Sequence, residues 1–569
     1  MNGRCTGRIA LASAILVAVA TTAAAQGGGR AGSPVRRDTT TGFAIHDAKV
    51  IQSCVRCHRR DSTTGMIERL SYERKTPEGW ETSIRRMVML NDVKLEPADA
   101  RAIVRYLSNA QGLAPAEVRP GRFEMERRFI EHRYTADRTT EVTCRACHSL
   151  GRVITQRRTR DEWELLIATH RGLYPDVDFQ GFRRGAPPPP DSAAQPHPMD
   201  AAISHLARTF PLRTPEWAAW SATMRTAPME GSWILSGNEP GRGAFYGRMT
   251  ITKSPTAPDE FTTRASYRYV NGGKTVVRTG KSIVYTGFQW RGRSTESPAD
   301  TGLREVMFVE PAWQEMSGRW FRGSYDEFGL DVKATRISAA PAIAGTSKAA
   351  VRTNTRDEEL ILFGANLPRT VTPDMVDLGP GLRVLRVVRA TPDSITLRIA
   401  ADSAAATGKR DLFIAGTTLR DAIIVYDKIN RIKVTPGAGM ARVGGGAYPK
   451  QYQQFEVVGW NNGPDGKPET ADDYEVGPVN VTWSLEEYGV TYTDDDLKYV
   501  GAIDRNGLFT PSIDGPNPAR SQSRNNIGDV WAVATWQPPE AGARPIKGRA
   551  HLVVTVPLYM RWTAGLGTP

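Results

Sequence analysis

The chain has few residues of the two kinds that most often bind metals or attack substrates. Its 569 residues include five cysteines and eight histidines. So few cysteines exclude a scaffold held together by many disulfides. Histidine is scarce in the later part of the chain, and no Ser/His/Asp set or pair of carboxylates stands out there. Hydrolytic chemistry is therefore not expected in that part.

Long apolar runs are also scarce, and the one that exists begins the chain. Two arginines precede an apolar stretch over residues 9–20, and small residues up to Ala25 fit an A-x-A cleavage site. This pattern is typical of a secretory signal peptide, here residues 1–25, and is too short for a membrane span. Its removal takes away Cys5 and lowers the formal charge from +13 to +11, because Arg4 and Arg8 leave with it. No other run reaches 18 residues, so we expect an exported chain without a membrane span.

The four remaining cysteines lie in two short blocks about ninety residues apart, "SCVRCHRR" from residue 53 and "TCRACHSL" from residue 143. Each block contains Cys-x-x-Cys-His, the attachment signature of c-type haem. The two thiols add to the two vinyl groups of one porphyrin, and the adjacent histidine becomes the proximal iron ligand. The predicted attachment residues are Cys54, Cys57, Cys144 and Cys147, and the predicted proximal ligands are His58 and His148.

Other sites also use paired cysteines. A C-x-x-C pair can form a redox dithiol, two pairs can bind zinc, and adjacent thiols can form a structural disulfide. A zinc ribbon would place its pairs closer together and would not need a histidine after each. Because two full signatures use every cysteine of the mature chain, the sequence favours two covalent haems.

Each iron needs a sixth ligand, and the stretches after the two blocks suggest one. "KTPEGWETSIRRMVML" and "RTRDEWELLIATHRGL" align on Trp80 and Trp163 as two copies of one unit. Met87 and His170 each follow the tryptophan by seven residues, or two helical turns, so tryptophan and ligand share a helix face. Methionine and histidine are the usual distal ligands, although a methionine here can also be a core residue. The competing candidates are Met66 and Met89 for the first iron and His46, His132, His197 and His205 for the second.

Further helices flank these units. "LEPADARAIVRYLSNAQG" predicts a helix that begins at Pro97 and stops at Gly112, and "MDAAISHLARTF" predicts a looser counterpart in the second unit. The proline-rich insertion at residues 186–198 has the composition of a surface spacer.

After about Trp220 the pattern changes to short alternating runs separated by turn residues. We expect turns at Asn271-Gly272 and at Thr279-Gly280, a hairpin over residues 391–393, and a closing strand in "RAHLVVTVPLYMRW". Nearly 350 residues of this kind are too many for one β core, so two or three β domains are expected, with breaks near residues 338–346 and 427–430.

Two motifs in the β region superficially suggest ligand sites. "GRGAFYG" resembles a phosphate loop but lies between predicted strands with no helix after it. "TDDDL", with Asp494 to Asp496, lacks the ligand spacing of a calcium loop, and we interpret it as a solvated acidic turn.

Several short stretches, spread over nearly the whole mature chain, carry a specific resemblance. In the haem region they are "RKTPEGW", "RM" at Met87, "GLAPAE", "MERR" at Met125 and "DEWELLIATH" ending at His170. Further on they are "YTGFQWRG", "GRWF", "VDLGPGLRV", "VYDKI", "GLFTPSIDGPNPAR" and "NNIGD". Together they resemble the alpha subunit of quinohemoprotein amine dehydrogenase.

This resemblance implies a multidomain fold. An N-terminal α-helical dihaem cytochrome c domain is followed by three antiparallel β domains of barrel, sandwich or Ig-like type. We expect the dihaem domain at residues 40–220, with units at about 40–115 and 125–215. The β domains are expected at 228–337, at 338–427 (Ig-like) and at 428–560. The insertion at 186–198 and extra residues around Asp472 depart from the family pattern. Because the insertion lies beside the second unit, the way this unit docks with its neighbours stays open.

The resemblance also implies a function and partners. The family's enzyme is a periplasmic heterotrimer that oxidatively deaminates primary amines. A β-propeller subunit and a small subunit carrying cysteine tryptophylquinone complete it. Electrons pass from that quinone through two haems of the alpha subunit to a blue-copper protein or cytochrome c. A thioether ligand raises haem potential, so we expect electrons to reach the His148/His170 haem first and the His58/Met87 haem second.

The residues themselves agree with one part of this picture. No cysteine of the mature chain is left after haem attachment, so a cysteine tryptophylquinone cannot form here and must lie on another polypeptide. Two other hypotheses remain open. One is a stand-alone dihaem shuttle whose β domains bind a surface or polysaccharide, and the other is a dihaem subunit of a different periplasmic dehydrogenase, for alcohols or sugars.

Overall fold

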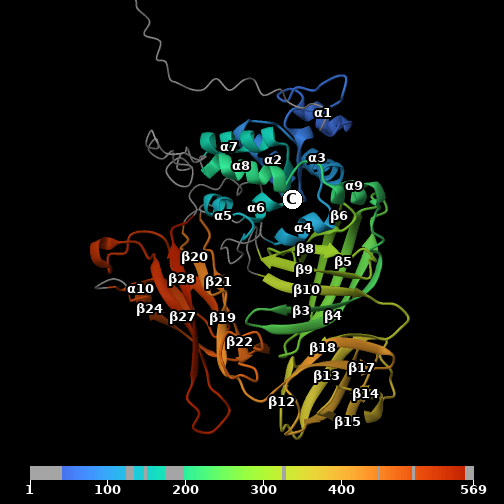
Figure 1. The fold of residues 1–569 in the computed structure, drawn as a ribbon, viewed down its shortest axis with the longest axis vertical. Coiled ribbons are helices and arrows are strands. Elements are labelled where there is room, and N and C mark those ends of the chain that lie inside the picture. Colours follow the sequence, from blue (N-terminus) through green and yellow to red (C-terminus); the bar gives the residue numbers. More distant parts are fainter. Residues whose placement is uncertain are drawn as a thin grey trace, which may run out of the picture. The chain divides into compact units, whose positions relative to one another are not determined.

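The computed structural model describes residues 42–123, 134–145, 150–173, 198–322, 329–445, 448–489 and 494–557 (Figure 1). The expected signal segment, Met125, Cys147, His148 and nearly all of the proline-rich insertion lie outside these ranges. Within them, a helical N-terminal domain is followed by three domains that are mostly antiparallel β, which confirms the predicted fold class. No helix in the described ranges combines the length and the apolar character that a membrane crossing requires.

The N-terminal domain is built from short helices and one pair of three-residue strands. Its elements are α1 (Ala48–Cys54), η1 (Leu70–Tyr72), β1 (Glu73–Lys75), α2 (Pro77–Leu90), α3 (Pro97–Ala110), α4 (Pro115–Val118), η2 (Arg119–Gly121), α5 (Arg138–Arg145), α6 (Gly151–Ile154), β2 (Gln156–Arg158), α7 (Arg160–Leu173), α8 (Pro198–Thr209) and α9 (Pro215–Thr223). The helices predicted around Pro97 and in "MDAAISHLARTF" are α3 and α8, so both predictions are confirmed.

Proline and threonine set the start of α2. The Thr76 side chain accepts a hydrogen bond from Gly79 N at 3.3 Å, and Pro77 occupies the first helical position. A threonine cap satisfies an N–H group that the helix leaves unpaired, and proline there loses no hydrogen bond. Helix α9 begins in the same way at Thr214 and Pro215.

Two separate apolar clusters form the core of the N-terminal domain, one for each predicted unit. The first contains Ile45, Val50, Ile67, Leu70, Trp80, Ile84, Ile103, Val104 and Leu107. The second contains Tyr134, Leu150, Val153, Ile154, Trp163, Ile167, Met199, Ala202, Ile203 and Leu206. Each cluster buries the tryptophan on which the two sequence copies align, which supports the alignment.

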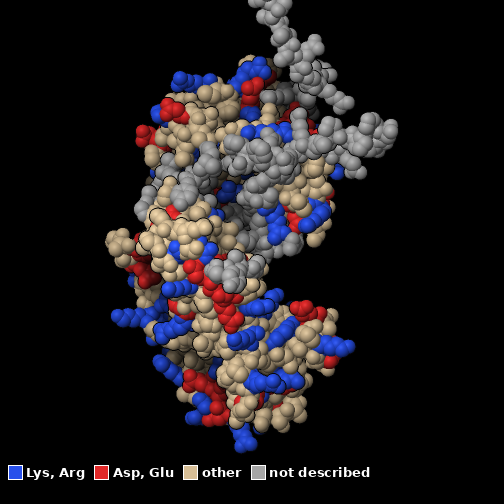
Figure 2. Space-filling view, turned by 90° about the vertical axis from the view of Figure 1, so that its left-hand side faces the viewer, with Lys and Arg blue, Asp and Glu red and all other residues tan. Residues whose placement is uncertain are grey.

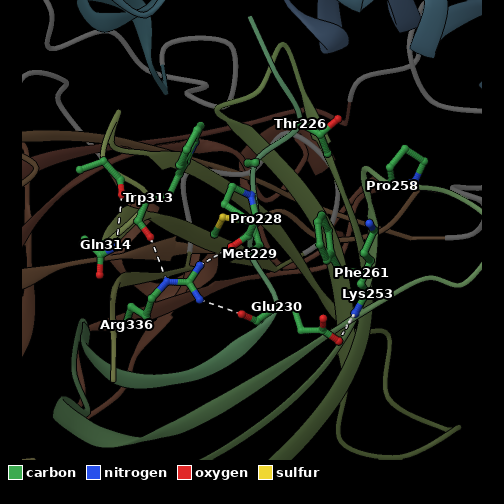
Figure 3. Close-up of a pocket in the computed structure, with 12 residues that line it drawn as sticks. Thr226, Pro228, Met229, Glu230, Lys253, Pro258, Phe261, Trp313, Gln314 and Arg336 are labelled. Atoms are coloured by element: carbon green, nitrogen blue, oxygen red, sulfur yellow. Dashed lines mark hydrogen bonds between the residues drawn. The ribbon is translucent and has the colours of Figure 1, made fainter. Parts of the chain in front are cut away.

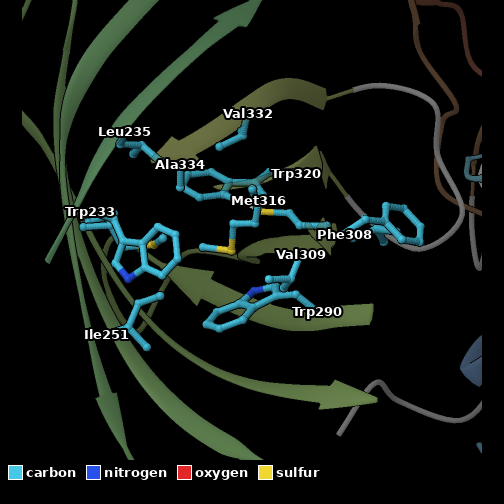
Figure 4. Packing of buried hydrophobic residues seen from close by; sticks show 14 of the residues in the cluster. Trp233, Leu235, Ile251, Trp290, Phe308, Val309, Met316, Trp320, Val332 and Ala334 are labelled. Carbon is cyan, nitrogen blue, oxygen red and sulfur yellow. Dashed lines mark hydrogen bonds between the residues drawn. The ribbon is translucent and has the colours of Figure 1, made fainter. Parts of the chain in front are cut away.

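The second domain is a closed antiparallel barrel. Its strands are β3 (Gly231–Glu239), β4 (Gly243–Lys253), β5 (Glu260–Tyr269), β6 (Val276–Tyr285), β7 (Gln289–Thr295), β8 (Leu303–Val309), β9 (Glu315–Arg322) and β10 (Gly329–Arg336). Neighbours in sequence pair with each other, and β10 closes the barrel on β3. The fully buried indoles of Trp233, Trp290 and Trp320 fill its interior together with Met316 (Figure 4). The interior is therefore a packed core.

One predicted turn in this barrel is wrong. Asn271-Gly272 does lie between β5 and β6, but Thr279-Gly280 lies inside β6, and the next turn is at residues 286–288. A Cβ on Gly280 would meet Arg293 O at 2.7 Å and Thr263 Oγ1 at 2.8 Å. Glycine is needed here because neighbouring strands approach closely, a role that produces the same sequence signal as a turn.

The third domain consists of two four-stranded sheets around one apolar cluster, with strand orders β11-β13-β16-β15 and β12-β18-β17-β14. Its elements are β11 (Ala342–Thr346), β12 (Ala350–Arg352), β13 (Glu358–Ala365), η4 (Pro373–Met375), β14 (Val376–Asp377), β15 (Leu382–Ala390), β16 (Ser394–Ala401), β17 (Gly408–Ile414) and β18 (Thr417–Tyr426). The hairpin predicted over residues 391–393 joins β15 to β16, so this prediction is confirmed.

The fourth domain has three small sheets, with strand orders β19-β22-β23, β20-β28-β27-β24 and β21-β26-β25. Its elements are β19 (Arg431–Thr435), β20 (Ala438–Arg442), β21 (Gln453–Gln454), β22 (Glu456–Asn461), β23 (Tyr474–Pro478), β24 (Thr482–Glu487), α10 (Asp496–Tyr499), β25 (Gly501–Ile503), β26 (Leu508–Pro511), η5 (Ser521–Ser523), β27 (Gly528–Trp536) and β28 (Ile546–Thr555). The expected closing strand is β28.

Polar and apolar contacts join the helical domain to the barrel. Arg105 of α3 pairs with Asp259 and, at 3.1 Å, with Glu260. Glu78 of α2 pairs with Arg291 of β7. Leu113 and Val118 belong to the same buried cluster as the barrel tryptophans, so this part of the helical domain packs into the barrel core.

We predict that Gly280→Ala lowers the free energy of unfolding of the barrel by about 1–3 kcal/mol, the usual cost of overpacking a well-packed site. Gly437→Ala is the matched control, since a Cβ there meets no atom within 4 Å. Urea unfolding followed by the fluorescence of the barrel tryptophans measures both. A Gly280→Ala protein as stable as the control would contradict the close approach described above.

Candidate haem sites

The first Cys-x-x-Cys-His block forms a continuation of helix α1. Cys57 N and His58 N both donate to Cys54 O, at 3.1 and 2.9 Å, so the two thiols and the imidazole lie within about one helical turn. Cys54 is half-buried against the first apolar cluster, whereas Cys57 is exposed. Burial, together with the neighbouring Cys57, raises the pKa of the Cys54 thiol to about 11. A reactive redox dithiol needs a lowered thiol pKa, so this environment disfavours that alternative.

The surroundings of His58 favour the neutral imidazole, the form that iron binding requires. Burial lowers the pKa of its imidazole, and the positive charge of Arg69 lowers it further, against the opposing effect of Glu73 and Glu68. A neutral imidazole keeps a nitrogen lone pair for a metal.

Met87 and its two competitors for the first iron differ in their surroundings. Met87 is half-buried on the face of α2 that also carries the buried Trp80 and Ile84. Its sulfur accepts a weak hydrogen bond from Asn91 Nδ2 at 3.8 Å. The Met89 side chain is 41% exposed on another face, and Met66 Sδ accepts from Tyr72 Oη at 3.5 Å.

In the second unit, Cys144 lies in the last turn of α5, half-buried against the second apolar cluster. His170 lies on α7, where its Nδ1 is 2.8 Å from Leu166 O. A neutral imidazole that donates from Nδ1 carries its lone pair on Nε2, the arrangement usual for histidine ligands. Burial lowers the pKa of His170, and the charges of Arg86 and Arg158 add to this effect against the Leu166 hydrogen bond.

The competing histidines are less suitable. His46 is exposed. His205 Nε2 is 2.7 Å from Tyr134 Oη, so that nitrogen already has a partner. His132 and His197 lie outside the described residues.

Two buried nitrogen atoms test whether a haem fits these units. Arg60 Nε, two residues after His58, and Trp163 Nε1, on the same helix as His170, are buried donors without a partner among the described residues. The equivalent indole of the first unit, Trp80 Nε1, donates to Gln111 O at 3.2 Å. Buried donors are nearly always paired, and the carboxylates of a haem are acceptors. Among the described residues, these donors, the thiols of Cys54, Cys57 and Cys144, and the axial candidates therefore fit a haem in each unit.

Strands β1 and β2 pair antiparallel and join the two units at equivalent positions. In each unit a strand residue places its cation over the aligned tryptophan: Lys75 Nζ lies 4.8 Å from the Trp80 ring centroid, and the Arg158 guanidinium lies 5.7 Å from that of Trp163. Thr76 and Thr159 then cap the helices that follow. Helices α2 and α7, which carry the candidate distal ligands, thus start at opposite ends of this two-stranded ribbon.

This ribbon is surrounded by buried charge. On one side, Glu117 of α4 accepts from Arg74 at 2.8 and 2.9 Å and pairs with Arg157 at 3.1 Å. All three side chains are less than 8% exposed. Burial alone raises the pKa of Glu117, but its hydrogen bonds with Arg74 and the nearby charges hold it below the usual range.

On the other side, two glutamates form ion pairs with three cations. Glu73 pairs with Lys75 at 2.8 Å and with Arg158. Glu162 of α7 pairs with Arg69 at 2.7 Å and with Arg158 at 3.8 Å. Burial opposes ionisation of Glu73, yet the charges of Arg158 and Lys75 lower its pKa to about 2. Sequence reasoning missed this cluster, whose only sequence signal is the run of charge before each aligned tryptophan.

The acidic turn at Asp494 to Asp496 requires a correction. Asp496 is buried, pairs with Arg520, and accepts a hydrogen bond from Asp529 N at 3.0 Å. Arg524 lies against all three carboxylates. The turn was expected to be solvated, but Asp496 is buried and two arginines pair with the three carboxylates.

A pocket of about 570 Å³ lies at one end of the barrel (Figure 3). It is lined by Trp313, Phe261 and Met229 with a few polar residues. Arg336 points into this region, and its guanidinium donates to the carbonyls of Pro228, Glu230 and Trp313. These hydrogen bonds hold the segment that leads into β3, so the arginine has a structural role.

Comparison with known proteins identifies one family in four consecutive segments. Profiles described as quinohemoprotein amine dehydrogenase alpha subunit match as haem binding at residues 45–217, domain II at 226–337, domain III at 342–427 and domain IV at 432–564. No curated protein matches.

Some solved structures are weakly similar. A redesigned β barrel is 14% identical, covering 19% of this chain and 92% of its own, with a TM-score of 0.17. The EC1-2 repeats of human mucin-like protocadherin are 15% identical, covering 38% and 98%, with a TM-score of 0.16. These likenesses are too weak to support a conclusion.

We predict that Glu117→Gln destabilises the region around β1 and α4 by about 3–5 kcal/mol, because Arg74 and Arg157 would be left buried without a carboxylate. Hydrogen exchange of the backbone amides in these elements measures the loss. Glu164→Gln, which removes an exposed ion pair with Arg160, is the control and is expected to change little.

The same contact predicts a pH dependence. The pKa of Glu117 is lower in the folded chain than in the unfolded one. Its contribution to stability is therefore complete above the ordinary glutamate pKa, about 4.3, and is lost as pH falls below it. Protection of β1 and α4 that is insensitive to acid in the native chain would contradict this role.

Proposed function

Because the chain belongs to the family of quinohemoprotein amine dehydrogenase alpha subunits, we propose that it is the electron-transfer subunit of a periplasmic enzyme that oxidatively deaminates primary amines. It takes electrons from a cysteine tryptophylquinone on a small partner subunit and delivers them to a soluble acceptor. The observation that carries this proposal is the haem-binding match at residues 45–217, which encloses both Cys-x-x-Cys-His blocks and both candidate distal ligands.

Each unit of the helical domain holds one covalent haem c in this proposal. Cys54 and Cys57 form the thioethers of the first, and Cys144 and Cys147 those of the second. His58 and Met87 bind one iron, and His148 and His170 the other. When bound, each haem supplies an iron centre that accepts single electrons, so that a two-electron oxidation can proceed in two steps.

The chain's own residues prepare these sites. Burial favours the neutral forms of His58 and His170, and the Leu166 carbonyl favours the tautomer of His170 that carries its proton on Nδ1. The two apolar clusters exclude water from Trp80 and Trp163 and from the helix faces that carry Met87 and His170.

The partners follow from the family and from cysteine usage. Every cysteine expected in the mature chain is assigned to a haem, so the quinone lies on the small subunit, and a β-propeller subunit completes a heterotrimer. The domain ranges we propose are 40–220, 228–337, 338–427 and 428–560, after a cleaved signal peptide at 1–25. The three β domains act as a scaffold that holds the helical domain against its partners.

The soluble acceptor is a blue-copper protein or a cytochrome c. A net charge of +11 on the mature chain attracts an acidic partner over long range, and the association rate then falls as salt rises. On the face drawn in Figure 2, basic and acidic side chains are interspersed. On that face the attraction therefore comes from the net charge and not from a patch of one sign.

We predict that the exported chain carries two haem additions and no free thiol, as measured by mass spectrometry. Replacing Cys144 and Cys147 by alanine should remove one haem, and replacing Cys54 and Cys57 should remove the other. Cys5→Ala is the control and should leave the mature mass unchanged. A native chain with one haem, or with a disulfide between the two blocks, would overturn the proposed function.

We also predict that the two haems differ in potential. Met87→His should lower the potential of one haem, because a thioether raises the potential relative to imidazole. His170→Ala should open the other iron to carbon monoxide. Redox titration and carbon monoxide difference spectra measure these effects, with Met89→Leu as the control that changes neither. Unchanged potentials in Met87→His would reject this ligand and direct the test to Met66.

A further inference from the structure

Lys75 holds its ammonium group in the buried interior of the helical domain. Its side chain is 5% exposed. The nitrogen donates to Glu73 Oε1 at 2.8 Å and to Ser83 Oγ at 2.7 Å, and it lies over the Trp80 ring. A buried charge is stable only with such partners, so the surroundings of this nitrogen decide whether it keeps its proton.

The cluster around Lys75 contains more positive than negative charge. Lys75, Arg158 and Arg69 share the carboxylates of Glu73 and Glu162. Arg86 of α2 acts on Lys75 as a further cation, and no described carboxylate lies within ion-pair distance of its guanidinium. Arginine keeps its proton in proteins, whereas lysine can lose it. Lys75 is therefore the cation of this cluster that can give up its charge.

The cluster also acts on residues of both predicted iron sites. Arg69 and Glu73 act electrostatically on His58, and Arg158 and Arg86 act on His170. The paired strands β1 and β2 carry the cluster and lead directly into the helices that bear Met87 and His170. The charge on this ribbon therefore affects the free energy of adding an electron at either iron site.

We propose that Lys75 Nζ binds one solvent proton when the helical domain gains an electron, and releases it when the electron leaves. The inference rests on the proposed function, since it requires haem in the domain. In the balanced step, the neutral amine takes up one proton while the reduced quinone of the partner, or a chemical reductant, supplies one electron. The net charge of the domain is then the same before and after reduction.

The electrostatics of the site agree with this role. Burial lowers the pKa of Lys75 to about 7, and Arg158 and Arg86 contribute to the decrease against the attraction of Glu73. Amine and ammonium are then both populated near neutral pH. A negative charge added nearby raises the pKa, so reduction draws a proton to Lys75 Nζ.

The two units differ at this position, and the difference supplies the test. The residue that aligns with Lys75 in the second unit is Arg158, whose guanidinium does not lose its proton in proteins. Lys75→Arg therefore keeps the positive charge and removes the exchangeable proton, whereas Lys75→Met removes both.

The experiment is a redox titration of both haems of the full chain, followed by absorbance, at intervals from pH 6 to pH 9. In the native chain the potential of at least one haem should fall with pH, by at most about 59 mV per unit for one proton per electron. Lys75→Arg should give a flat profile near the native low-pH value. Lys75→Met should give a flat profile at or below the native high-pH value.

Two further variants keep the test decisive. Glu162 is the other buried group of the cluster whose pKa is shifted toward neutrality, raised mainly by burial. Glu162→Gln should keep the slope, and a slope lost there but retained in Lys75→Arg would overturn the proposal. Ser83→Ala removes an acceptor of the Lys75 ammonium. The pH range over which the haem potential changes should then move to lower pH, and this shift tests the role of Lys75 if Lys75→Arg does not fold.

Failure of this inference is distinct from failure of the proposed function. Two haems with potentials that do not depend on pH, or with the same slope in native and Lys75→Arg chains, would overturn the role of Lys75 alone. A chain without covalent haem would overturn the function itself.

Discussion

Strands β1 and β2 meet in a layer of buried charge, and this layer joins the two units of the helical domain. Each strand has three residues, too few to hold two units together by backbone pairing alone. Moving a charge out of water costs several kcal/mol, so each buried cation must contact a carboxylate in good geometry. Glu73, Glu117 and Glu162 provide those contacts. The pairs of Glu73 with Arg158 and of Glu162 with Arg69 cross from one unit to the other, so the layer helps to hold helices α2 and α7 in place.

Much of the fold could be predicted because its signals are local. Helix α3 shows a proline start and an apolar face, and the β15–β16 hairpin shows a turn between alternating runs. The prediction failed at Gly280 because glycine serves two purposes, turning the chain and admitting a close neighbour. The neighbour in this case is the backbone of β7, which a local pattern cannot reveal. Closure of the barrel between β10 and β3 likewise depends on residues far apart in the sequence.

The candidate haem residues were accessible to sequence reasoning because cysteine spacing and helical spacing are both short-range. Met87 and His170 were predicted from their distance to an aligned tryptophan, and their role as ligands stays a prediction. The charged layer was not accessible. Arg74 and Glu117 are 43 residues apart, and a run such as "ERKT" is usually a solvated surface. Similarly, the burial of Asp496 depends on Arg520, 24 residues away.

The burial of two residues of the helical domain in the barrel core has a consequence for folding during synthesis. Leu113 and Val118 belong to the N-terminal domain in sequence but are buried among the barrel residues. During synthesis these side chains emerge well before β10 closes the barrel on β3. The helical domain therefore keeps part of its apolar surface exposed until the strands that cover it have been synthesised. A gene fragment that ends at the domain boundary would leave that surface permanently exposed.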